Sequence, residues 1–186
     1  ELDEINDQIV NEIKKLKGDV TGLKGDENIV YVEKKKADRD LGFVGTITNI
    51  NRRIIDKHLK QGHITVLAPM GMSADQQTHN VNADEVASAI ASSMCAEKFV
   101  LLTNVPGVLH DPKDPSTLYS TLTLAEIEKL KKEGIIAGGM IPKVDSCIDA
   151  VLGGIPKAHI IDARIDRALL LEIFTDTGVG TQIVQK

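Results

Sequence analysis

From Leu41 onward, short apolar segments of strand length alternate with longer segments whose apolar residues recur at helical spacing. Mostly apolar runs such as 64–68 and 99–102 are typical of strands that are buried on both faces. The amphipathic segments between them supply helices that cover such strands. This alternation predicts an α/β fold, with an open, mainly parallel sheet sandwiched between helices.

The individual elements follow from periodicity and from stop signals. Strands are expected at 29–32, 43–48, 64–68, 99–102, 159–161 and 180–184. Helical spacing marks segments 5–16, 54–59, 86–94, 127–133, 144–152 and 169–174. The fourth of these helices has the clearest start, because Thr123 and Glu126 have the spacing of a capping box and Leu122 and Ile127 that of a hydrophobic staple. Gly134 is its expected end.

Charge and aromatic content exclude some classes of function. Lys and Arg number 22 against 27 Asp and Glu, which gives a net charge of −5 and argues against general binding of nucleic acid or of an anionic membrane. With five aromatic residues and no Trp, the chain has little to stack on bases. The charged run 34–40 has two interpretations, a phosphate-binding patch or a solvated turn whose charges cancel, and the mixture of signs favours the second.

Cysteine usage and hydropathy predict a cytoplasmic protein. Cys95 and Cys147 are the only cysteines, each in an apolar stretch, which indicates structural thiols in a reducing compartment. A catalytic thiol is disfavoured because neither has an obvious His beside it. No apolar run has membrane-spanning length, and no signal segment opens the chain, which starts at Glu1.

Ligands of open α/β sheets bind beyond the carboxyl ends of the strands, so the polar segments 70–84 and 103–109 are where a site is expected. The sequence contains neither a P-loop nor a Rossmann glycine motif after a strand. A phosphate-capable feature remains: Gly138 and Gly139 precede a helix start, and Lys143 falls in the first turn. The alternative, a glycine-rich helix entry with an exposed lysine, is equally consistent with the pattern.

The segment before the third helix also carries polar residues with two interpretations. Asn80 and Asp84 share one face if the helix starts early, which would place Asn80 on a substrate and let Asp84 orient cationic groups. Alternatively, these residues and Asn82 are capping groups. The histidines lack metal-ligand spacing, and no second acid accompanies Asp84, so no metal site is predicted.

Taken in order, these segments resemble the N-acetyl-L-glutamate kinases of the amino acid kinase superfamily. The matching stretches are 40–45, 80–84, 101–109, 138–143, 159–162, 170–175 and 178–181, so the likeness covers almost the whole chain. The resemblance implies an amino acid kinase-like fold and the ATP-dependent phosphorylation of the γ-carboxylate of N-acetyl-L-glutamate, a step of arginine biosynthesis. Mg²⁺ is implied with ATP, held largely by the phosphates.

The resemblance also implies roles for individual residues. Lys143 falls on the lysine that stabilises the transferring phosphoryl group, Asp84 on the aspartate that organises the catalytic lysines, and Asn80 on the substrate-binding asparagine. The residues implied in nucleotide binding are Asn104, Val105, Pro106, Gly107, Val108, Leu109, Ile135, Ile136, Ala137, Gly138 and Gly139. Many family members have Asp where this chain has Asn104, which is expected to weaken or alter nucleotide binding.

A regulatory site is implied by the C-terminal match. His159, Glu172 and Gly178 fall on positions that bind arginine in members inhibited by it. A carboxylate suits a guanidinium or an α-amino group. Taken without the resemblance, the same residues are a polar group at a strand end, a solvated helix residue and a turn.

The match further implies two lobes: 1–96 as the remaining part of an acetylglutamate-binding lobe, and 97–186 as the nucleotide-binding lobe. The family's N-terminal strand, with a second catalytic lysine and a Gly-Gly substrate loop, has no counterpart here. We therefore expect the chain to be inactive alone and to form a homo-oligomer, or to associate with the missing segment. The alternatives are a non-catalytic module that binds ATP or arginine, and a sister kinase that acts on another carboxylate.

Overall fold

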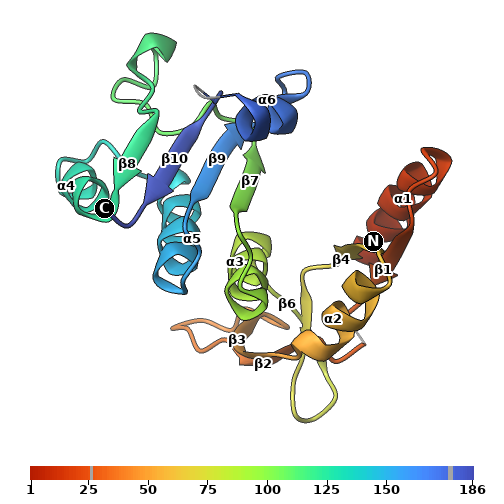
Figure 1. Cartoon of the computed structure of the whole chain (residues 1–186). Coiled ribbons are helices and arrows are strands. Elements are labelled where there is room, and N and C mark those ends of the chain that lie inside the picture. The colour runs from red at the N-terminus through yellow and green to blue at the C-terminus, as the bar shows by residue number, and fades with distance from the viewer. Residues whose placement is uncertain (26, 176–177) are drawn as a thin grey trace. The chain divides into compact units, whose positions relative to one another are not determined.

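The computed structural model describes residues 1–25, 27–175 and 178–186, and they form two compact units (Figure 1). Unit 1 is Glu1–Met94 and unit 2 is Cys95–Lys186. Unit 1 comprises α1 (Leu2–Lys15), β1 (Val20–Leu23), β2 (Val30–Lys34), β3 (Gly45–Ile50), α2 (Arg52–Lys60), β4 (Ile64–Leu67), β5 (Met70–Met72), β6 (Thr78–Asn80) and α3 (Ala83–Met94).

Unit 2 comprises β7 (Phe99–Thr103), a short 3₁₀ turn (Pro115–Thr117), β8 (Thr121–Thr123), α4 (Leu124–Lys132), α5 (Met140–Leu152), β9 (Ala158–Asp162), α6 (Ala168–Phe174) and β10 (Thr181–Val184). Among the described residues, none of the helices combines the length and the apolar character needed to cross a membrane.

The two units contain separate sheets. In unit 1, a four-stranded sheet has the order β3-β2-β5-β6, and β1 pairs with β4 in a two-stranded sheet. In unit 2, one sheet has the order β7-β9-β10-β8. Four of the seven strand pairs in the described chain are parallel, and β10 runs antiparallel to β9. The predicted α/β fold with mainly parallel strands is confirmed, with several sheets in place of one.

The core of unit 2 forms around β9, all five residues of which are buried. Such complete burial requires cover on both faces, and the two polar residues of this strand, His159 and Asp162, are buried with side-chain partners. Helix α5 packs across β7, β9 and β10, α6 contacts β9, and α4 contacts β8. In Figure 1 the four strands lie side by side, with α5 running along them.

The capping analysis is confirmed at α4. The Thr123 hydroxyl accepts a hydrogen bond from the Glu126 backbone N–H, and the Glu126 carboxylate accepts one from the Thr123 N–H at 2.7 Å. Leu122 and Ile127 are buried. A local polar signal therefore predicted this helix start correctly, because its partners are only three residues apart.

Some predictions for unit 1 and its boundary are wrong. The segment 70–84, for which a polar, turn-rich stretch and no strand was expected, contains the antiparallel pair β5 and β6, two strands of three residues each. Asn80 therefore lies in a strand and shares no helix face with Asp84. Cys95, expected to be a buried structural thiol, is exposed, with a φ of 52° at the end of α3. Cys147 is buried in α5.

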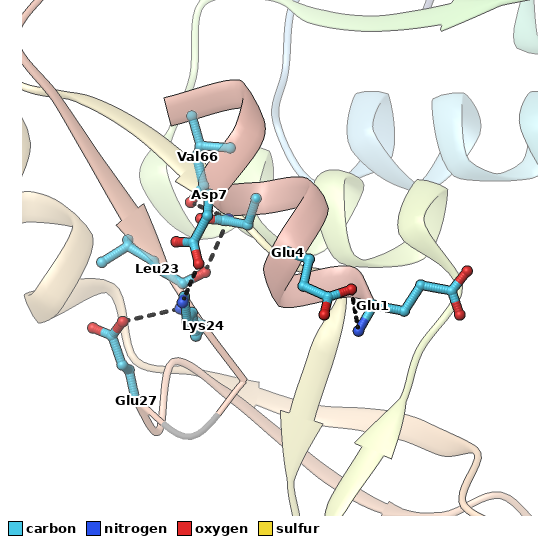
Figure 2. A network of polar contacts seen from close by, with 8 residues as sticks. Glu1, Glu4, Asp7, Leu23, Lys24, Glu27 and Val66 are labelled. Atoms are coloured by element: carbon cyan, nitrogen blue, oxygen red, sulfur yellow. Dashed lines mark hydrogen bonds and ion pairs between the residues drawn. The ribbon is translucent and has the colours of Figure 1, made fainter. Parts of the chain in front are cut away.

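Helix α1 is fastened to β1 and β4 by one buried amide. The Asn6 side chain is only 3% exposed, and its Nδ2 donates to the Val66 carbonyl at 2.8 Å and to the Leu23 carbonyl at 3.4 Å. Figure 2 shows the surrounding contacts on the same helix, including the ion pair between Lys24 and Asp7 at 2.8 Å. A side chain at Gly22 would overlap Asn6 Oδ1, so the absence of a Cβ there allows the close approach.

We predict that Asn6→Ala destabilises unit 1, because two buried carbonyls lose a donor. The free energy of unfolding should fall by about 1–3 kcal/mol, measured by denaturant titration. Asn11→Ala, an exposed position of the same helix, is the control and should change it by less than about 0.5 kcal/mol. Equal effects of the two substitutions would show that the buried amide contributes nothing beyond helix propensity.

Candidate functional site

The loop that follows β7 forms one wall of an apolar cavity in unit 2. This cavity has a volume of about 440 Å³, which is enough for a nucleoside-sized ligand. The other wall comes from the segment that joins α4 to α5 and from Met140, the first residue of α5. The residues that line it are Val105, Pro106, Gly107, Val108, Leu109, His110, Pro112, Gly134, Ile135, Ala137 and Met140. We call it the apolar cavity, and we call residues 104–109 the β7 loop.

Two threonine hydroxyls fix the β7 loop. At its start, the Thr103 hydroxyl accepts from the Val105 N–H at 3.0 Å and donates to the Val105 carbonyl at 2.9 Å. Further on, the Val108 N–H donates to the Thr181 hydroxyl at 2.8 Å. Gly107 has a φ of 142°, and a Cβ there would lie 2.5 Å from that same hydroxyl oxygen, so glycine is required.

Seven of the eleven residues predicted to bind a nucleotide line this cavity. The others are Ile136, which is buried in the core, and Asn104, Gly138 and Gly139, which are exposed. Sequence analysis missed His110, Pro112, Gly134 and Met140 as lining residues. His110 is the notable omission, because its Nδ1 lies 2.9 Å from the Tyr119 hydroxyl, which orients the ring. The signal in the sequence that could have identified His110 as a lining residue is its position immediately after the β7 loop.

Lys143 lies in the first turn of α5, three residues after Met140 of the cavity wall. Gly139 is the N-terminal cap residue and supplies no side-chain hydrogen bond. A salt bridge from Lys131 of α4 to Asp145 at 2.5 Å, in the second turn of α5, ties this end of α5 to the neighbouring helix. The partial positive charge of a helix N-terminus and the lysine charge therefore lie on the same turn, an arrangement suited to a phosphate group.

In unit 1, Asn82 is the capping residue of α3. Its Oδ1 accepts from the backbone N–H groups of Asp84 and Glu85, at 2.9 and 3.1 Å. The alternative that Asn82 caps the helix is confirmed, and Asp84 is left in the first turn with a partly buried side chain. Asn80 is exposed on β6, where its backbone N–H donates to Phe43. Among the described residues, no three His, Cys, Asp or Glu side chains gather as metal ligands.

The structure brings His159, Glu172 and Gly178 together at a second cavity of unit 2, which has a volume of about 500 Å³. We call it the polar cavity. Glu172 is buried, and its Oε1 lies 2.6 Å from His159 Nδ1. Because an ionised carboxylate only accepts, the ring nitrogen is the donor. The two lysines that also line the cavity, Lys98 and Lys157, directly precede β7 and β9.

The other oxygen of Glu172 binds backbone. Its Oε2 accepts from the Val179 N–H at 2.7 Å and from the Gly180 N–H at 3.2 Å. Gly178 has a φ of 61°, and a Cβ there would lie 2.6 Å from Oε2. The contrary interpretation of Glu172 as a solvated helix residue is therefore wrong, because the carboxylate is buried and accepts three hydrogen bonds.

A third polar feature lies at the carboxyl end of β9. Asp162 pairs with Arg164, whose Nη2 and Nε donate at 2.7 and 2.9 Å, and whose backbone N–H donates at 2.9 Å. Hydrogen bonds from the Arg164 side chain and from its backbone N–H lower the pKa of Asp162 from 3.8 to about 2. Asp162 stands opposite Thr103 in the β7–β9 pairing, so this ion pair borders the start of the β7 loop.

Residues 3–162 match the amino acid kinase family. The chain belongs to this family. It is 45% identical over 183 residues to the acetylglutamate kinase of Syntrophomonas wolfei, a match that covers 98% of this chain and 64% of the relative. It is 46% identical to the acetylglutamate kinase of Petrotoga mobilis, with 98% and 61% covered. The chain thus spans about two thirds or slightly less of the length of these curated relatives.

Solved structures show the same fold. The crystal structure of smu.665 from Streptococcus mutans UA159 has a TM-score of 0.82 at 28% identity, and the match covers all of this chain and 69% of that one. N-acetylglutamate synthase from Neisseria gonorrhoeae, complexed with coenzyme A and L-arginine, has a TM-score of 0.79 at 26% identity. That match covers 91% of this chain and 38% of the synthase.

We predict that Arg164→Gln raises the pKa of Asp162 from about 2 toward its usual value, as followed by the carboxyl ¹³C shift during a pH titration. A carboxyl group whose pKa is lower in the folded than in the unfolded state stabilises the fold at pH values above its unfolded-state pKa. This stabilisation is lost as the pH falls through its folded-state pKa. The wild type should therefore be more stable than Arg164→Gln above pH 3.8, and the difference should shrink between pH 3.8 and about 2 and vanish below that range.

The control is Arg167→Gln, whose guanidinium lies 3.8 Å from the exposed Asp166. This substitution should leave the Asp162 titration unchanged. A stability difference for Arg164→Gln that persists unchanged to pH 2 would contradict the assignment of the effect to this ion pair.

Proposed function

We propose that the chain is the larger part of an acetylglutamate kinase, which transfers the γ-phosphoryl group of ATP to the γ-carboxylate of N-acetyl-L-glutamate in arginine biosynthesis. The observation that carries the proposal is the identity of 45% to an acetylglutamate kinase across 98% of this chain. The apolar cavity, which lies beside a helix start bearing Lys143, supports it independently, because nucleotides need an apolar place for the base and a positive place for phosphates.

The nucleotide base is proposed to bind in the apolar cavity, against the β7 loop and Met140. The fit is supported by the cavity volume of about 440 Å³ and by its mainly aliphatic lining. The oriented ring of His110 adds one polar edge for the base. Mg²⁺, when bound with the phosphates, supplies neutralisation of their charge. In this division, residues 97–186 form the nucleotide lobe and residues 1–96 contribute to binding acetylglutamate.

In-line phosphoryl transfer needs positioning and charge neutralisation rather than a covalent nucleophile. Lys143 is proposed to stabilise the negative charge that spreads over the transferring group, helped by the N-terminus of α5. Asp84 is proposed to orient cationic groups, and Asn80 to hydrogen-bond the substrate. A carboxylate and an amide suit these roles, because one attracts lysines and the other both donates and accepts.

We predict that Lys143→Ala lowers kcat by about 100-fold or more, because one charged donor to the transition state is lost. The assay is phosphoryl transfer to N-acetyl-L-glutamate, in a family-length protein that carries these 186 residues, for example a fusion to the first third of the Syntrophomonas wolfei relative. The chain alone should bind Mg-ATP without turnover. Lys132→Ala, an exposed lysine of α4, should retain full activity. Unchanged kcat in Lys143→Ala would remove that residue from catalysis.

The polar cavity is proposed to bind L-arginine as a feedback inhibitor. Its two lysines and the Glu172 carboxylate give it both charges, which suits a zwitterion whose carboxylate faces the lysines and whose cationic group faces Glu172. The arginine complex of the Neisseria gonorrhoeae synthase, whose fold this chain shares, supports arginine as the ligand.

We predict that Glu172→Gln weakens L-arginine binding by about tenfold or more, because a charge-assisted hydrogen bond becomes a neutral one. Isothermal titration calorimetry with the chain measures the affinity. Glu133→Gln removes an exposed carboxylate elsewhere in unit 2 and should have no effect. An affinity for L-arginine that is the same in Glu172→Gln as in the wild type would refute the proposed contact.

A further inference from the structure

One short segment of unit 2, residues 178–182, lines the polar cavity and also contacts a residue that lines the apolar cavity. Gly178, Gly180 and Gln182 line the polar cavity. Thr181, which stands between them in sequence, binds the β7 loop at the apolar cavity. Successive residues of a strand point to opposite faces, so Gln182 faces the polar cavity while Thr181 faces the β7 loop. The segment 178–182 therefore lines the polar cavity and supports the wall of the apolar cavity from behind.

On the polar side, the Glu172 carboxylate fixes this segment. It accepts hydrogen bonds from the Val179 and Gly180 N–H groups. Thr181 is the residue that follows Gly180. Gly180 also lies so close to the Ile160 carbonyl oxygen that a Cβ there would overlap it, and Thr181 pairs with Ile160 of β9, so the segment has little room to take another path. The position of Thr181 thus depends on the hydrogen bonds that Glu172 accepts.

On the apolar side, Thr181 is completely buried, and its hydroxyl is the acceptor for the Val108 N–H at 2.8 Å. Val108 is 1% exposed, so this N–H has no access to bulk water as a substitute. A buried N–H that loses its acceptor is costly, and the loop has to move to find another. The hydroxyl of Thr181 therefore sets where the β7 loop lies.

We propose that Thr181 is a positioning residue for the β7 loop, and that Glu172 fixes Thr181 through the Val179 and Gly180 amides, so that the polar and apolar cavities are energetically coupled. The inference rests on the proposed function for the statement that the apolar cavity holds a nucleotide. The coupling itself is a property of the hydrogen bonds. A ligand that draws the Glu172 carboxylate away from these amides loosens the β7 loop and weakens nucleotide binding.

The first test is amide hydrogen exchange at Val108, measured by NMR on the chain and expressed relative to the buried amide of Ile160. Thr181→Val, which keeps the shape but removes the acceptor, should speed the relative exchange by about tenfold or more, and Thr181→Ser should restore it. Glu172→Gln should speed it by about threefold or more, although Glu172 accepts from Val179 and Gly180, and Val108 donates to Thr181.

Thr123→Val is the matched control. It removes a threonine hydroxyl that caps α4 and lowers the stability of unit 2. It should accelerate Val108 and Ile160 equally, so the relative exchange stays at the wild-type value. If Glu172→Gln does not fold, His159→Asn, which removes one of the three donors to that carboxylate, replaces it. Wild-type relative exchange at Val108 in the Glu172 or His159 variant overturns the coupling.

The second test is the affinity for Mg-ATP, measured by calorimetry. Thr181→Val should weaken it by about tenfold, Thr181→Ser should restore it, and Thr123→Val should leave it unchanged. Equal losses in Thr181→Val and Thr123→Val would reduce Thr181 to a stabilising residue and overturn its positioning role. A wild-type chain that binds no Mg-ATP contradicts the nucleotide site itself, and the exchange ratios still decide the coupling in that case.

Discussion

The parallel pairing of β7 with β9 is the constraint on which both cavities of unit 2 depend. It places Thr103 opposite Asp162 at the carboxyl ends, so the β7 loop and the turn that carries Arg164 emerge side by side. It also brings together the amino ends, where Lys98 and Lys157 line the polar cavity. Because β9 is buried along its whole length, neither strand can slip in register without exposing apolar side chains. One strand pair thus sets the positions of the groups at both ends.

The buried Glu172 links these two ends. A carboxylate that is removed from water is costly unless donors replace the lost hydration. His159 Nδ1 and two backbone N–H groups supply that replacement, and the glycine at 178 lets the chain come close enough for the third hydrogen bond. A carboxylate satisfied in this way organises the chain around it. A ligand cation that approaches Glu172 therefore competes with donors that hold β10 in place.

The sequence predicted what depends on neighbours a few residues away. Local signals predicted their elements correctly: the capping box of Thr123 and Glu126, the helical periodicity and the continuous apolar runs of the strands. It failed at β5 and β6, because strands of three residues are too short to show a periodicity. The resemblance placed His159, Glu172 and Gly178 at one site. Their hydrogen bonds to Val179 and Gly180, and the hydroxyl of Thr181 under Val108, depend on tertiary packing that no spacing in the sequence reveals.

The four residues 178–181 illustrate how two sites can constrain one segment. Gly178 is fixed by its positive φ and by the nearby carboxylate, and Gly180 by the carbonyl of Ile160. Thr181 is fixed by the N–H that it accepts. Val179 takes part in these contacts through its backbone N–H alone. Of the four residues, it is therefore the one whose side chain can change without affecting these contacts. Gly178 and Gly180 are constrained by Glu172 and by β9, and Thr181 is constrained by the β7 loop. A segment under this double constraint transmits a displacement at Glu172 to Val108, because Gly180, which binds Glu172, and Thr181, which binds Val108, are adjacent residues.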